Sequence, residues 1–207
     1  VVICVHGLLR QGRDFDVLAQ ALCDGAGGDL RVICPDVAGR GRSDWLSDPM
    51  AYQIPVYGAD MLALLAHLHR EAPMTTLDWV GTSMGGLIGM VVAGQPGLPL
   101  PTPVRRMVLN DVGPVIQWSA LQRIGGYVGQ TGRFPSLQAA ADAMWAVSSS
   151  FGPHTPEQWL ALSQHMVRPV GDDASSAFTL HYDPAIAVPF KALTEASAQA
   201  GRSEERR

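Results

Sequence analysis

Short apolar runs and longer stretches with helical spacing follow one another along the chain. Four runs rich in β-branched and other apolar residues predict strands at residues 1–6, 30–34, 75–80 and 105–110. Between them, apolar residues recur at the spacing of one helix face, which predicts helices at residues 15–26, 56–70 and 87–93. Strands that alternate with helices over such short distances predict parallel βαβ units, and therefore the α/β fold class with a mostly parallel sheet and flanking helices.

The pattern changes after Pro114. Residues 115–190 contain no convincing strand, and helical stretches at about 116–129, 136–148 and 156–167 are separated by loops rich in Gly and Pro. We interpret this segment as a helical cap over the carboxyl edge of the sheet. The predicted organisation is a core at residues 1–114, a cap at 115–190 and a polar tail, expected to be disordered, at 191–207.

Composition narrows the classes of function. The chain has 207 residues, of which 47% are hydrophobic and 16% charged, so it can bury a substantial core. Its 15 Lys and Arg against 19 Asp and Glu give a net charge of −4, which offers no basic excess for nucleic acid. No apolar run has the roughly 18 residues of a membrane span. A small-molecule substrate is the expected partner, with neither nucleic acid nor membrane.

The three cysteines, Cys4, Cys23 and Cys34, lack the spacing of a metal site. We expect three reduced thiols in a cytoplasmic protein, with no metal and no cofactor.

The sharpest chemical motif is Gly-Thr-Ser-Met-Gly-Gly at residues 81–86, between a predicted strand and a predicted helix. A serine hydroxyl is a poor nucleophile unless it stands clear of the fold and meets a base. A tight strand–turn–helix bend achieves the first condition, and it needs small residues where strand and helix pass closely. Ser83 is therefore the candidate nucleophile, and the alternative is a glycine-rich packing turn.

A second motif, His-Gly-Leu-Leu at residues 6–9, ends the first predicted strand. Acyl transfer needs two N–H donors for the oxyanion of the tetrahedral intermediate. One donor follows the nucleophile, here the Met84 amide, and the other comes from a loop after an earlier strand, here the Leu8 amide. On its own this motif also fits a simple strand-ending turn.

These two motifs, together with Pro-Asp-Val-Ala-Gly-Arg-Gly-Arg-Ser-Asp at residues 35–44, resemble the α/β-hydrolase superfamily, in its bacterial branch of serine esterases, lactonases and carbon–carbon bond hydrolases. The resemblance covers residues 1–114 well and the cap more loosely. It implies a serine hydrolase acting on a small ester, lactone or related carbonyl compound through an acyl-Ser83 intermediate. The loop at residues 36–43 would be a structural turn near the site.

The same resemblance implies a triad in the chain order Ser, Asp or Glu, then His. Nothing after the cap is predicted to be a strand, so the resemblance implies a chain that lacks the last strands of the sheet and is truncated at both ends. Asp111, which ends the strand after Ser83, is a candidate acid, and the alternative is that it satisfies the backbone of the loop into the cap. None of the six histidines stands in a motif for the triad base.

Two further residues are candidates for substrate binding. His6 belongs to the loop that carries the Leu8 amide and is expected to order it through hydrogen bonds. Arg10 follows three residues after Gly7 and is placed at the same edge of the sheet, either as a donor to substrate or in a structural role. Since the triad histidine is missing from the pattern, a non-catalytic binding protein or an inactive fragment remains the alternative to an active enzyme.

Overall fold

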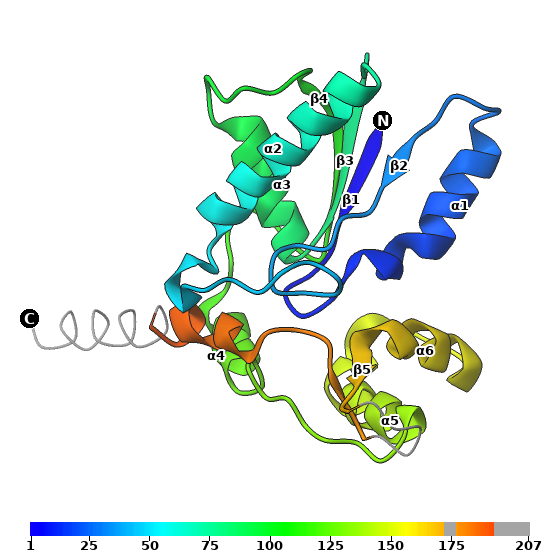
Figure 1. The fold of residues 1–207 in the computed structure, drawn as a ribbon, viewed down its shortest axis with the longest axis vertical. Helices are drawn as coiled ribbons and strands as arrows, with labels where there is room; N and C mark the ends of the chain where they lie inside the picture. Colours follow the sequence, from blue (N-terminus) through cyan, green and yellow to red (C-terminus); the bar gives the residue numbers. More distant parts are fainter. Residues whose placement is uncertain (172–176, 193–207) are drawn as a thin grey trace, which may run out of the picture.

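The computed structural model describes residues 1–171 and 177–192. Its centre is a parallel sheet with the strand order β2–β1–β3–β4 (Figure 1). The strands are β1 (Val2–Val5), β2 (Val32–Ile33), β3 (Leu77–Thr82) and β4 (Val104–Asn110). The predicted α/β class, with a mostly parallel sheet, is confirmed.

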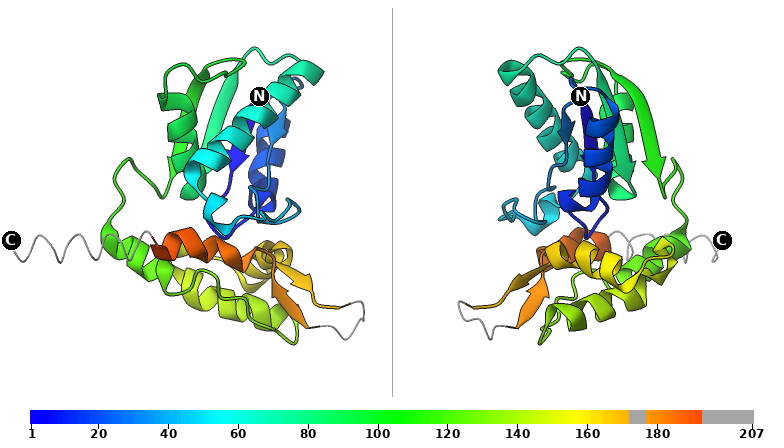
Figure 2. Two further views of the ribbon diagram at one scale, coloured as in Figure 1. Left: turned by 60° about the vertical axis from the view of Figure 1, so that its left-hand side comes forward. Right: turned by 90° about the vertical axis from the view of Figure 1, so that its right-hand side faces the viewer.

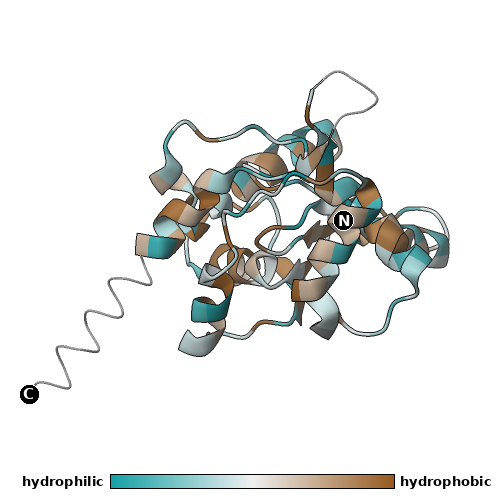
Figure 3. Cartoon of the chain, turned by 90° about the horizontal axis from the view of Figure 1, so that it is seen from below, coloured by the Kyte–Doolittle hydropathy of each residue, from teal (hydrophilic) through white to brown (hydrophobic). Residues whose placement is uncertain are grey.

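Helices cover both faces of this sheet. The helix α1 (Asp16–Gly25) lies on one face, and α2 (Ile54–Glu71) and α3 (Met84–Gly94) pack together on the other (Figure 1). Pro55 stands in the first turn of α2, where its missing N–H costs nothing. Colouring by hydropathy shows helices with polar and apolar positions around their circumference, as expected when one side packs on the sheet (Figure 3).

The burial of each strand follows its place in the sheet. All four residues of the central strand β1 are buried, and β3 alternates buried and half-buried positions. The main core forms where α2 and α3 pack against the sheet, around Trp79, Leu65 and Ile88, each fully buried. By contrast, β4 pairs only with β3 among the described strands, and the side chain of Val108 is 55% exposed.

The segment after β4 forms a layer beneath the carboxyl ends of the strands (Figure 2). Its helices are α4 (Trp118–Gly125), α5 (Leu137–Ser148) and α6 (Pro156–Ser163). After these helices, β5 (Val167–Pro169) and β6 (Phe178–Leu180) form a two-stranded antiparallel ribbon. Short 3-10 helices complete the chain: η1 (Gly12–Phe15), η2 (Pro49–Ala51), η3 (Ser149–Phe151), η4 (Gln164–Met166) and η5 (Pro184–Ile186).

The ribbon corrects the expectation that residues 115–190 hold no strand. Each of its strands has only three residues, too few for a periodic pattern to show. The pairing depends on partners brought together by the fold, such as the bridge from Phe134 to Phe178. Most of the predicted tail, at residues 193–207, lies outside the described residues. Among the residues that the structure describes, none of the helices is long and apolar enough to cross a bilayer.

Candidate active site

Ser83 occupies a strained bend between β3 and α3. Its backbone has φ 50° and ψ −114°, in the positive-φ region that residues with a side chain rarely adopt. The strain is held by backbone hydrogen bonds, because the Ser83 N–H donates to the carbonyl oxygen of Asn110 at 2.9 Å and its own carbonyl oxygen accepts from Gly86 at 2.9 Å. The Ser83 hydroxyl has no hydrogen-bond partner among the described residues, so it is free to meet a ligand.

The glycines of the motif are required by close packing. A Cβ on Gly85 would lie 1.9 Å from the carbonyl oxygen of Val5, and one on Gly81 would lie 2.5 Å from the Gly85 backbone. The indole of Trp79 also donates to the Gly85 carbonyl oxygen at 3.0 Å. Strand β3, the start of α3 and the end of β1 therefore fit together only because these positions have no side chain.

The loop after β1 lies beside Ser83. A Cβ built on Gly7 would be 3.8 Å from the Ser83 Cβ, which sets the two chain segments in van der Waals contact. The carbonyl oxygen of Gly7 is held by the Nδ1–H of His6 at 2.8 Å and by the N–H of Arg10 at 3.1 Å. Since carbonyl and N–H of one peptide point in opposite directions, these bonds fix the direction of the Leu8 N–H. That N–H makes no hydrogen bond to another described residue.

Ser83, Leu8 and Met84 line one cavity of about 500 Å³. This volume is in the usual range for small-molecule sites, and most of the lining is apolar. Core and cap both contribute walls, with α4 and the segment around η5 on the cap side. The described lining residues are Leu8, Tyr52, Gln53, Ile54, Pro55, Tyr57, Ser83, Met84, Leu87, Asp111, Val112, Ile116, Ala120, Leu121, Arg123, Ile124, Ile186, Pro189 and Phe190.

Asp111 reaches this cavity from the end of β4. It follows Asn110, whose carbonyl oxygen holds the Ser83 N–H, so the two loops are adjacent. Its φ of 55° makes it the second strained non-glycine residue among those described. The carboxylate lies where a polar group can face substrate, and no described histidine is hydrogen-bonded to it.

His6 and Arg10, the two candidates for substrate binding, are not among the residues that line this cavity. His6 is fully buried, and its Nε2 accepts from the Val37 N–H at 2.9 Å while its Nδ1–H is bonded to Gly7. Burial lowers the pKa of His6 to about 4, so the ring is neutral near pH 7. Arg10 forms a two-pronged ion pair with Asp14 at 2.6 and 2.7 Å. Both side chains are committed to holding the loop.

All six histidines fall within the described residues, and none of them lines the Ser83 cavity. His67 is exposed and faces Glu71, and His69 accepts a hydrogen bond from the backbone of the loop that follows its helix. His154, His165 and His181 belong to the cap segment, away from Ser83. The arrangement thus presents a half-buried serine with an unpaired hydroxyl and two backbone donors, and no imidazole among the described lining residues.

Arg40 is a buried residue of the site that sequence reasoning missed. Its side chain is fully buried, and its Nε donates to the Leu8 carbonyl oxygen at 2.8 Å. Its Nη1 donates to the carbonyl oxygen of Ala38 at 2.7 Å and to the Tyr57 hydroxyl at 2.8 Å. The guanidinium also lies 4.9 Å from the centre of the Tyr57 ring and contacts the Met84 sulfur at 3.5 Å. The only local feature that accompanies this buried role is the position of Arg40 between Gly39 and Gly41, which both have positive φ.

The Arg40 loop also joins core to cap. The N–H of Asp183 donates to the Gly39 carbonyl oxygen at 2.8 Å, and the Gly41 N–H donates to the His181 carbonyl oxygen at 3.1 Å. The hydroxyl of Tyr52, a residue that lines the cavity, donates to the Asp183 carboxylate. The expected structural turn at residues 36–43 therefore ties the roof of the cavity to the loop that carries Leu8.

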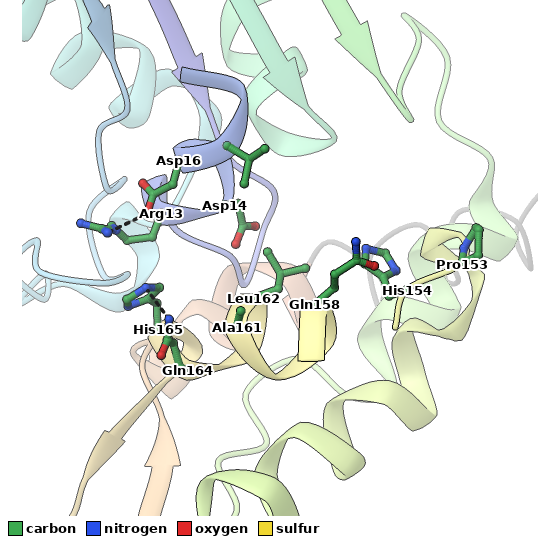
Figure 4. Close-up of a pocket in the computed structure, with 11 residues that line it drawn as sticks. Arg13, Asp14, Asp16, Pro153, His154, Gln158, Ala161, Leu162, Gln164 and His165 are labelled. Carbon is green, nitrogen blue, oxygen red and sulfur yellow. Dashed lines mark hydrogen bonds and ion pairs between the residues drawn. The ribbon is translucent and has the colours of Figure 1, made fainter. Parts of the chain in front are cut away.

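A second cavity, of about 520 Å³, opens between η1, α1 and α6 (Figure 4). Its charged groups are already paired, because Arg13 binds Asp16 at 2.6 Å and Asp14 binds Arg10. His165 lies at one end of this cavity beside Gln164, and His154 lies farther along it (Figure 4). Ser83 takes no part in it. Across the described part of the chain, no group of three or more His, Cys, Asp or Glu side chains has the geometry of a metal site.

Comparisons with known proteins agree with this geometry. A protein-family model described as alpha/beta hydrolase fold matches residues 1–137. A protein of Cupriavidus necator named 3-hydroxybutyrate-oligomer hydrolase is 49% identical over 203 residues, which is 98% of this chain and 65% of that protein. The chain thus spans just under two thirds of the length of this curated relative.

Two solved structures have the same architecture. A putative hydrolase from Rickettsia typhi superposes with a TM-score of 0.77 at 31% identity, over 90% of this chain and 60% of its own. An α/β hydrolase from Novosphingobium aromaticivorans gives a TM-score of 0.76 at 37% identity, over 92% of this chain and 62% of its own.

Proposed function

The chain belongs to the α/β-hydrolase family, and we propose that it supplies the nucleophile and the oxyanion-binding amides of a serine hydrolase that cleaves a small carboxylic ester. The observation that carries the proposal is the strained bend of Ser83, with its free hydroxyl lining the same cavity as Leu8 and Met84. Such a bend costs stability at a residue with a side chain, and it is the conformation that an attacking hydroxyl needs.

In the proposed reaction, the Ser83 oxygen attacks the ester carbonyl, and the carbonyl oxygen becomes an oxyanion. The N–H groups of Leu8 and Met84 stabilise that charge. Met84 begins α3, where the first N–H groups have no partner within the helix and the helix dipole favours an anion. The alcohol leaves with the serine proton, and water then releases the acid from Ser83.

The proton transfers need a base that the six histidines do not provide from their observed positions. An added base can take this role, which makes the proposed nucleophile testable. Without a base, only substrate binding and the oxyanion donors contribute to catalysis. Together they accelerate the reaction roughly 10³- to 10⁴-fold over the rate in water.

For the substrate, we propose the ester of a short hydroxyacid. The 49% identical relative is named for hydrolysis of 3-hydroxybutyrate oligomers, which are esters of this type. A mostly apolar cavity of about 500 Å³ is suited to short branched acyl chains.

Added imidazole provides a direct test. We expect imidazole to accelerate hydrolysis of p-nitrophenyl butyrate by the chain. The rate should level off at high imidazole concentration, when imidazole occupies the cavity. Ser83→Ala serves as the control, because it removes the nucleophile and leaves the uncatalysed reaction of imidazole with the ester. Equal rates in both proteins at every imidazole concentration would favour the second candidate function, a binding protein, which the absence of histidine from the cavity supports.

A further inference from the structure

The Ser83 cavity has two charged side chains among its described lining residues, Asp111 and Arg123. Two neutral side chains on the wall each have one partner already. The Tyr57 hydroxyl accepts from Arg40 at 2.8 Å, and the Gln53 amide donates to the Met50 carbonyl oxygen at 2.6 Å. The groups on the wall that can attract or repel an ion are the Asp111 carboxylate and the Arg123 guanidinium.

Arg123 reaches the cavity from the last turn of α4. Ala120, Leu121 and Ile124 of the same helix also line the cavity, so Arg123 belongs to the face that α4 turns towards it. The helix lies beneath the carboxyl ends of the strands, across from the bend that holds Ser83 (Figure 1). A cation in the last turn of a helix is favoured by the helix dipole, which stabilises the charge at this place.

Within the part of the chain that the structure describes, no acidic side chain pairs with this charge. Arg123 forms no ion pair and no side-chain hydrogen bond with another described residue, Asp111 included. A guanidinium is charged at every relevant pH and carries five N–H donors in a planar fork. Here the fork stands at the wall of a mostly apolar cavity, where an anion would replace water as its partner.

We propose that Arg123 binds a carboxylate of the substrate, so that the site takes an ester whose alcohol part is itself a hydroxycarboxylic acid. This inference rests on the proposed function, which it makes more specific. The carboxylate pairs with Arg123 under α4 while the ester carbonyl lies at Ser83. Attack forms the bond between Ser83 oxygen and acyl carbon, and the bond to the alcohol oxygen breaks. That oxygen takes the serine proton, and a free hydroxycarboxylate leaves.

The arrangement also orients the substrate. Asp111, at the end of β4, repels a carboxylate, while Arg123 attracts one. An ester with a single terminal carboxylate is therefore bound in one direction, with the acid end towards α4. An uncharged ester of the same shape lacks this anchor and is held by apolar contact alone.

Binding to Ser83→Ala tests the proposal without any turnover. The probes are the butanoyl ester of β-hydroxybutyrate and the methyl ester of the same compound, titrated while backbone amide chemical shifts are recorded by NMR. We expect the free acid to bind about tenfold more tightly than its methyl ester at low salt, because only the acid can form a charge-assisted contact with the Arg123 guanidinium. The difference should fall as salt is added.

The arginine is then varied in the Ser83→Ala background. Arg123→Gln should remove the preference for the acid, and Arg123→Lys should restore part of it. Arg133→Gln is the matched control, because Arg133 is an exposed arginine of the same segment that does not line the cavity. Equal affinities for acid and methyl ester, or a preference that survives Arg123→Gln, would overturn the inference. Phosphonylation of Ser83 in the unsubstituted chain tests the proposed function separately, so failure of one is distinguished from failure of the other.

Discussion

The guanidinium of Arg40 holds the carbonyl oxygen of Leu8 at 2.8 Å, at the centre of a fully buried cluster. Leu8 carries one of the two amides proposed to bind the oxyanion, and its loop has little other support from regular structure. A buried cation is stable only when its donors are satisfied, and Arg40 meets this condition through carbonyl oxygens and two tyrosine rings. The geometry of the Leu8 loop thus depends on a residue of a different loop.

Replacing this arginine should be costly. We expect Arg40→Met to lower the free energy of unfolding by about 3 kcal/mol, because it removes the donors to the half-buried carbonyl oxygens of Leu8 and Ala38 and to the buried Tyr57 hydroxyl. Urea unfolding followed by tryptophan fluorescence measures the change. Arg42→Met is the matched control, since Arg42 is exposed in the same loop, and it should change stability by less than about 0.5 kcal/mol. Similar losses in both variants would contradict the role assigned to Arg40.

The close contact between α3 and β1 predicts opposite outcomes for two glycines of α3. Gly85→Ala should destabilise the protein by roughly 3 kcal/mol or prevent folding, because the new methyl would overlap the Val5 carbonyl oxygen. Gly94→Ala places its methyl in open space and should raise stability by up to about 1 kcal/mol. Thermal unfolding by circular dichroism separates the two. A folded Gly85→Ala protein with an unchanged midpoint would show that the bend is not packed as described.

Stability should fall in acid because of His6. Burial lowers its pKa in the folded state to about 4, below the value of about 6.5 in an unfolded chain. Between these values the unfolded state binds more protons, so stability is retained above about pH 6.5 and lost as the pH falls towards 4, by about 3 kcal/mol in total. Burial also lowers the pKa of His181, which adds to the same slope.

The slope of the unfolding free energy against pH is measured by urea unfolding at several pH values between about 4.5 and 7.5. His6→Asn should flatten it, whereas His67→Asn, at an exposed position, should leave it intact. A slope that is equally steep in His6→Asn would assign the acid sensitivity to other groups.

The effect of substituting Asp111 on stability should depend on the backbone conformation at this position. Its φ of 55° costs a residue with a side chain about 1–2 kcal/mol, and the cost is greatest for a β-branched side chain. Asp111→Val should therefore lower the unfolding free energy by about that amount. Asp111→Gly should be close to neutral, because the relief of strain is offset by the greater backbone entropy of glycine in the unfolded state. Equal effects in the two variants would indicate that the side chain, and not the backbone, matters at this position.

The sequence predicted those parts of the fold that depend on local pattern. The strand β3, the bend at Ser83 and the helix α3 lie within about 20 consecutive residues, and each leaves its own periodicity or glycine signature. The α/β class followed from the alternation of such elements, which is why it was confirmed.

What the sequence missed depends on contacts between distant segments. Arg40 receives its role from residues near positions 8, 57 and 84, and nothing local marks it as buried. The ribbon of β5 and β6 forms from two strands of three residues. The carboxylate of Asp14, just before α1, binds Arg10, and no side chain caps α1. This ion pair, which ties Arg10 to its own loop, has no local signature in the sequence either.

The most direct test of the account is the reaction of the chain with a fluorophosphonate probe in imidazole buffer, followed by intact-mass and peptide mass spectrometry. We predict a single adduct, mapped to Ser83, that forms faster as free imidazole increases and is absent from Ser83→Ala. A folded chain that forms no adduct, or one whose adduct forms at the same rate in Ser83→Ala, would contradict the assignment of Ser83 as a nucleophile.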